Sequence, residues 1–122
     1  MLIMEQGDES VVNVLPNINK MRIPAEKFTQ YALNYDREFN KAIAFELALG
    51  YNENNYQLLI DTIHENVSQY EATPKGDIGY GMKYEVIMQI TGPNGKTAKV
   101  LTAWIDDTNA GELRLTNAYV DK

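Results

Sequence analysis

The spacing of apolar residues changes near the middle of the chain. Between residues 24 and 67 apolar side chains recur every three or four positions, which is typical of amphipathic helices. The pattern predicts three helices, with these boundaries: Pro24 to about Leu33, Asp36 as N-cap to Gly50 as C-cap, and Asn52 as N-cap to about Val67. We expect their apolar stripes to supply one side of the core.

From Gly79 onward the spacing becomes two, which predicts strands. Apolar and polar positions alternate up to Ile90, and the turn sequence Gly92-Pro93-Asn94-Gly95 follows. A second strand is predicted over about 96–105 and a third over about 112–120. The sequence therefore predicts an α+β fold, in which about three N-terminal helices pack on a C-terminal three-stranded antiparallel β-meander.

A length of 122 residues favours one domain. Residues 1–20 are polar and weakly patterned, so we expect them to be a leader or linker that is partly ordered at best. Residues 21–122 are expected to form the single α+β domain. The first residues do not form a secretory signal, and no run approaches the ~18 apolar residues of a membrane span. No membrane association is expected, and the compartment stays open between the cytoplasm and secretion within a larger effector.

The predicted hairpin fixes which side chains share a face. Pairing Thr91 with Lys96 across the turn sends Val86 and Tyr84 to the core face, opposite Leu101 and Ala103. The other face then carries two rows, expected to be solvent-exposed: Lys83–Trp104–Arg114 and Glu85–Thr102–Thr116. If one strand slipped by one residue relative to its neighbour, its side chains in these rows would move to the opposite face of the sheet.

This group of residues suits phosphodiester cleavage without a metal. In that interpretation the catalytic residues are Glu85 as base, Lys83 and Arg114 as stabilisers of phosphate charge, and Thr102 beside them. Trp104 would stack a base, with Lys96 and Thr116 as further substrate-binding residues. The alternative is an ordinary solvated sheet face with cross-strand ion pairs.

Composition limits the chemistry. The chain has no cysteine, which excludes disulfides, thiolate-bound metals and a cysteine nucleophile. No nucleotide- or metal-binding motif is present, and the single histidine, His64, is expected on the surface of a helix, so we expect neither cofactor nor metal. The net charge of −6 argues mildly against nucleic acid as a partner, but residues 75–105 carry four lysines against two acids.

Several segments, in order, resemble a family of uncharacterised bacterial domains. They are Leu15-Pro16-Asn17, Ile23 to Phe28, Lys41-Ala42, Leu49 to Asn52, Gly81 to Tyr84, Thr91 to Ala98, Thr102 to Trp104 and Leu115 to Tyr119. Such domains occur at the C-termini of phage head-morphogenesis proteins and of polymorphic-toxin-like proteins. Their layout is similar to that of the barnase/EndoU/colicin/RelE-like ribonuclease toxins. One departure is the segment Asn34 to Phe39, where the family usually has proline and glycine.

Two functions follow from these observations. The resemblance and the predicted sheet face imply a metal-independent ribonuclease-like toxin effector domain with RNA as its substrate. The acidic helical half favours instead a non-catalytic interaction module, such as an immunity-type protein that binds a cognate toxin or a phage accessory protein.

Overall fold

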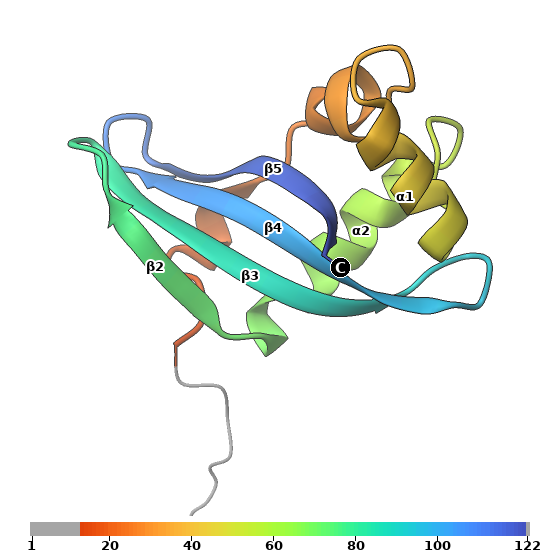
Figure 1. Ribbon diagram of the computed structural model, residues 1–122. Coiled ribbons are helices and arrows are strands. Elements are labelled where there is room, and N and C mark those ends of the chain that lie inside the picture. Colours follow the sequence, from red (N-terminus) through yellow and green to blue (C-terminus); the bar gives the residue numbers. More distant parts are fainter. Residues whose placement is uncertain (1–12, 122) are drawn as a thin grey trace, which may run out of the picture.

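Five strands form one mixed sheet in the computed structural model, which describes residues 13–121 (Figure 1). The strands lie in the order β1-β5-β4-β3-β2. Their bounds are β1 Met21–Arg22, β2 Ala72–Asp77, β3 Gly81–Thr91, β4 Thr97–Asp107 and β5 Glu112–Asp121. The last three strands make the predicted antiparallel meander, and β1 joins β5 in parallel.

The prediction of a three-stranded antiparallel sheet was therefore wrong. β1 has only two residues, which pair with Leu113 and Arg114, so it is too short to show any periodicity. β2 contains Pro74 and Gly76, two residues that normally argue against a strand. Its edge position accommodates the proline, because an edge strand does not need every N–H for pairing.

Two longer helices lie on one face of this sheet, α1 (Phe39–Leu49) and α2 (Tyr56–Asn66). Gly50 ends α1 in the left-handed conformation at φ 86°, as the sequence predicts. The predicted N-caps were wrong: α1 begins after Glu38 and α2 after Asn55. The side chains of Asn34 and Asn52 accept backbone N–H bonds two residues ahead and so form turns upstream of each helix.

The first predicted helix is present over residues 26–32, and its last five residues form a π-helix, η3 (Phe28–Ala32). Two further short turns are η2 (Ile18–Lys20) and η4 (Val67–Gln69). Although η3 is short, Phe28, Ala32 and the adjoining Leu33 are buried in the core. Phe28 and Ala32 were thus interpreted correctly as a buried face, whereas Tyr31 of the same apolar stripe is 43% exposed. The helix begins two residues later and ends one residue earlier than predicted.

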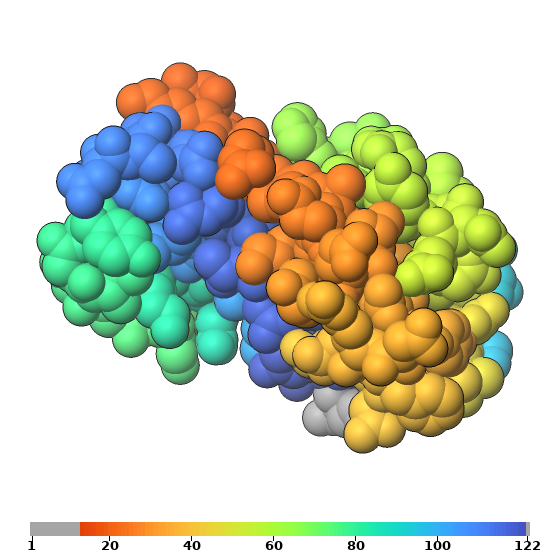
Figure 2. Space-filling view, turned by 90° about the horizontal axis from the view of Figure 1, so that it is seen from above, coloured from red at the N-terminus to blue at the C-terminus, as the bar shows by residue number. Residues whose placement is uncertain are grey.

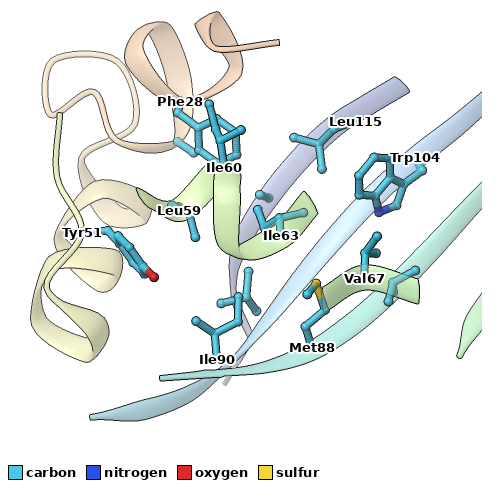
Figure 3. Close-up of a cluster of buried hydrophobic side chains, with 14 of the residues drawn as sticks. Phe28, Tyr51, Leu59, Ile60, Ile63, Val67, Met88, Ile90, Trp104 and Leu115 are labelled. Atoms are coloured by element: carbon cyan, nitrogen blue, oxygen red, sulfur yellow. The ribbon is translucent and has the colours of Figure 1, made fainter. Parts of the chain in front are cut away.

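The core lies between the helices and one face of the sheet (Figure 3). Leu59, Ile63 and Val67 from the α2 region meet Met88 and Trp104 from the strands. All five are almost wholly buried. The opposite face of the sheet, which carries Lys83, Glu85, Ile87 and Gln89 of β3, is called the outer face below.

Part of the expected leader belongs to the fold. Leu15 is buried in the core, and the carbonyl oxygen of Asn13 accepts a hydrogen bond from the Ala72 amide at 2.6 Å. Asn17, in the left-handed conformation, donates from its side chain to the Asp106 carboxylate. Residues 1–12, the rest of the expected leader, lie outside the described part of the chain.

The β3–β4 hairpin is one residue longer than the turn sequence predicts. Thr91 pairs with Thr97 rather than with Lys96. The Gly92 amide donates to the Lys96 carbonyl at 2.9 Å, so the loop runs from Gly92 to Lys96. Gly92 also lies against α1, since a Cβ added there would be 2.0 Å from the Leu49 carbonyl oxygen. This longer loop shifts the register of β4 by one residue and reverses which of its side chains face the core.

Candidate functional site

Thr102 and Trp104 lie in the core, so the expectation that they share an exposed face was wrong. In the observed register Val86 pairs with Thr102 and Tyr84 with Trp104, which puts both residues on the helix side. Trp104 is only 1% exposed. The two residues form a buried polar pair, because the Trp104 indole donates to Thr102 Oγ1 at 2.8 Å. Neither side chain can contact a substrate on the outer face.

The remaining predicted residues near them do share the outer face. Lys83 pairs with Ile105, which pairs in turn with Arg114, so the two cations flank a buried isoleucine in one row. Glu85 lies in the next row, opposite Ala103. Thr116 is adjacent on β5, and its hydroxyl donates to the Ala103 carbonyl oxygen at 3.2 Å.

Two β-bulges flank this part of the face. In β2, Pro74 pairs with Tyr84 and Gly76 with Lys83, which leaves Lys75 as the extra residue. In β5, Leu115 pairs with Trp104 and Asn117 with Ala103, which leaves Thr116 as the extra residue. Bulges redirect side chains and are over-represented next to active sites. Here one redirects Lys75, whose ammonium lies 3.9 Å from Glu85 Oε1.

Two adjoining hollows occupy this region. The larger, about 380 Å³, is lined by residues of β2 to β5 that include Lys75, Lys83, Glu85, Thr116 and Asn117. The smaller, about 260 Å³, lies toward the β2–β3 loop and is lined by residues that include Ile78, Tyr80 and Arg114. Lys83 and Thr116 line both hollows, so the two hollows adjoin, and we call them together the groove. We call the larger hollow the central pocket and the smaller one the loop pocket.

Arg114 is held in place by two carboxylates. Its Nη1 lies 2.8 Å from Glu112 Oε2 and 3.1 Å from Asp107 Oδ2. These bonds raise the pKa of Arg114, with Glu112 contributing most. The Ala110 amide and then Arg114 lower the pKa of Asp107, whereas Arg114 and then Arg22 lower that of Glu112. All these groups are therefore charged at neutral pH, and the guanidinium is partly neutralised.

Lys96 is separated from the other predicted residues. It lies in the exposed β3–β4 loop, whereas Lys83 is near the opposite end of β3. His64 is exposed on α2, as the sequence predicts. Among residues 13–121 no group of three or more histidine, aspartate or glutamate side chains is arranged to hold a metal ion. No helix in the described part of the chain is long and apolar enough to cross a membrane.

Sequence reasoning missed several residues of the groove, among them Lys75, Ile78, Tyr80, Asn117 and Tyr119. The combination Pro74-Lys75-Gly76 was a usable signal, because proline and glycine within a strand often mark a bulge. Asn117 was undetectable without the second bulge, which moves it into the row of Glu85.

The comparisons with known proteins identify a family without an assigned activity. A family model described as a domain of unknown function (DUF6883) matches residues 14–122. The chain belongs to this family. No curated protein and no solved structure matches the chain. The resemblance to an uncharacterised domain family is thus supported by the match, and the DUF6883 domain includes residues 14–20, the last part of what was expected to be a leader.

Proposed function

We propose that the DUF6883 domain binds RNA on the outer face of its sheet and cleaves it by internal attack of a ribose 2′-hydroxyl. The observation that carries this proposal is the groove that joins Lys83 and Glu85, with a bulge on each side. A carboxylate next to lysine side chains is what this reaction needs, since one group must accept a proton while others stabilise negative charge on phosphate.

The reaction uses the central pocket. Glu85 takes the proton of the 2′-hydroxyl, the 2′-oxygen bonds to phosphorus, and the bond from phosphorus to the 5′-oxygen breaks. The departing 5′-oxygen takes a proton from the Lys75 ammonium, and Glu85 then returns its proton to Lys75, 3.9 Å away. Lys83 stabilises the charge on the phosphoryl oxygens. The products are a 2′,3′-cyclic phosphate and a 5′-hydroxyl.

The surroundings of the central pocket support these roles. Among residues 13–121, Lys83 has no carboxylate within 4.0 Å, so its charge is available to a ligand. The segment 75–105, which supplies both lysines and Glu85, has a surplus of positive charge within an acidic chain. The resemblance to polymorphic-toxin-like domains is consistent with a toxin effector of this kind, for which an immunity protein covering the groove would be the natural partner.

The test is cleavage of total tRNA in the presence of EDTA. We expect the wild type to cut tRNA and leave 2′,3′-cyclic phosphate ends. Glu85→Gln should lower the rate at least about 100-fold, because a general base contributes that much or more. Glu65→Gln, on the exposed side of α2, is the matched control and should cut at the wild-type rate. Intact tRNA at high concentrations of the wild-type protein would overturn the proposal.

A second function, as a non-catalytic interaction module, is favoured by the exposed side of α1. Phe39 and Leu47 are 58% and 66% exposed, and Leu47 lines one of two hollows that both contain Ala44 and Val120. Large apolar side chains that stay exposed about two turns apart on one helix are available for a protein contact. If expression of the domain is toxic to bacteria, toxicity that survives Glu85→Gln but is lost in Leu47→Glu would favour this function over catalysis.

A further inference from the structure

The loop pocket lies at the end of the sheet that the helices leave uncovered. Figure 2 shows the helical half, in orange to yellow-green, gathered at one end, and the β2–β3 loop and β4–β5 turn, in teal and blue, together at the other. The β2–β3 loop and the strands β3, β4 and β5 line the pocket, with Ile78, Tyr80, Lys83, Trp104, Ile105, Arg114 and Thr116. At about 260 Å³ it is smaller than most ligand sites, which suits one flat ring system rather than a whole nucleotide.

We infer that the loop pocket holds a guanine base, stacked on Tyr80 and read by Arg114. The inference rests on the proposed function, because it names the base that the proposed ribonuclease prefers. The first support is the pair of exposed apolar side chains at the mouth of the pocket. Ile78 is 41% exposed and Tyr80 40% exposed, although both are large and mainly apolar. Aromatic rings exposed beside cations are the usual platforms for nucleobases.

The loop that carries Tyr80 is fixed by hydrogen bonds. The Tyr80 carbonyl oxygen accepts from the Thr108 amide at 2.8 Å and from Thr108 Oγ1 at 2.7 Å. The Ile78 amide donates to the Gly81 carbonyl at 2.9 Å, and the Gly79 amide donates to Asp77 Oδ1 at 2.7 Å. The backbone that presents the ring is therefore tied to the β4–β5 turn before any ligand arrives, which lowers the entropy lost on binding.

Arg114 supplies the donors that distinguish guanine from adenine. Both of its ion pairs use Nη1, and within residues 13–121 no acceptor lies within hydrogen-bond distance of its Nε or Nη2. A guanidinium presents paired N–H donors that match the O6 and N7 acceptors of guanine. Adenine has an amino donor in place of O6, which would face the donors of Arg114. Because Asp107 and Glu112 fix the guanidinium, it is already oriented for one base.

The position of the pocket gives the site of cleavage. Lys83 and Thr116 line both the loop pocket and the central pocket, so a guanosine seated in the first places its own ribose and 3′-phosphate toward Glu85 in the second. The 2′-hydroxyl that attacks then belongs to the guanosine itself. Cleavage is expected on the 3′ side of guanosines.

Binding and cleavage test the inference separately. Titration of the ¹⁵N-labelled wild type with 3′-GMP should shift the amide signals of Gly79, Tyr80, Lys83 and Thr116, and 3′-AMP should bind at least about ten-fold more weakly. Tyr80→Ala should weaken 3′-GMP binding about ten-fold. Tyr31→Ala is the matched control, since Tyr31 is 43% exposed on η3, and it should bind like the wild type. The cleavage sites in tRNA are mapped with the same three proteins.

The outcomes distinguish the two proposals. Preference for 3′-GMP, its loss in Tyr80→Ala and cuts after guanosine support the inference. Cleavage of tRNA without any base preference would overturn the guanine pocket and leave the ribonuclease proposal standing. Selective binding of 3′-GMP with intact tRNA would support the pocket and overturn the ribonuclease proposal. Equal binding of 3′-GMP and 3′-AMP, or none of either, would overturn the inference.

Discussion

Trp104 Nε1 donates a hydrogen bond to Thr102 Oγ1 at 2.8 Å, and that hydroxyl donates in turn to the Val86 carbonyl oxygen at 2.9 Å. The two side chains project from the same face of β4 and are buried. This short chain of hydrogen bonds links the indole to the backbone of β3. It explains how a tryptophan and a threonine are accommodated in an otherwise apolar core, since buried polar groups need partners.

Replacing Thr102 by valine should destabilise the domain by about 1–3 kcal/mol. The indole N–H of Trp104 would lose its acceptor in the core, and the Val86 carbonyl oxygen would lose the hydroxyl that donates to it. Urea unfolding followed by the fluorescence of Trp104 measures this free energy. Thr73→Val on the exposed edge strand is the control, and it should change the stability by no more than about 0.5 kcal/mol. Equal stability of the two variants would contradict the role given to Thr102.

Gly92→Ala should be more destabilising than Gly95→Ala, although both change the same loop. At Gly95 a Cβ meets nothing within 4 Å, so alanine suffers only the penalty of a positive φ, about 1–2 kcal/mol. At Gly92 the Cβ would be 2.0 Å from the Leu49 carbonyl oxygen, so the hairpin must move away from α1. We expect an additional loss of about 1–3 kcal/mol in chemical denaturation. A larger loss at Gly95 would contradict the close contact.

The carboxylates around Arg114 should make stability depend on pH. Asp107 and Glu112 have lowered pKa values in the folded protein, so their contribution is fully present above their ordinary pKa and is lost as the pH falls through the lowered values. Arg114→Gln removes one cause of both shifts. The wild type should therefore exceed this variant in stability at pH 7, and the difference should narrow below about pH 4. A difference that stays constant between pH 7 and pH 3 in urea titrations would count against this coupling.

Two leucines of α1 should respond differently to truncation. Leu49 is wholly buried, and Leu49→Ala should lower the free energy of unfolding by about 2–5 kcal/mol. Leu47 is 66% exposed, and Leu47→Ala should change it by less than about 0.5 kcal/mol. Thermal and urea unfolding of the two variants give the comparison. A large loss in Leu47→Ala would show that this side chain stabilises the monomer and is not kept for a partner.

The parts of the fold that were predictable are those with a strong local signal. Gly50 marks the end of α1, and the alternation along β3 assigns Val86, Met88 and Ile90 to the core. The edge strands β1 and β2 lack such a signal, because one is two residues long and the other is interrupted by Pro74 and Gly76. Their position depends on contacts with distant segments, which a local pattern does not show.

The candidate site was predictable only in part for a related reason. Lys83 and Glu85 were placed correctly because they lie on β3, whose faces follow from its own alternation. Thr102 and Trp104 were misplaced because the predicted faces of β4 depended on the length of one loop. One extra residue in that loop exchanges the core-facing and outward-facing side chains of the strand. In β5, Arg114 kept its predicted face although its neighbour in β4 is Ile105 and not Trp104. Tyr80 was overlooked because loops have no periodicity.

The pairing of β1 with β5 has a consequence for how the domain is made. Met21 pairs with Leu113, roughly ninety residues later in the chain, so the sheet has its complete set of strands only when nearly all of the domain has left the ribosome. Contacts of such long sequence separation slow folding, because the intervening chain must be ordered first. The sheet should therefore stay incomplete, and any activity of the outer face absent, until β5 has been synthesised.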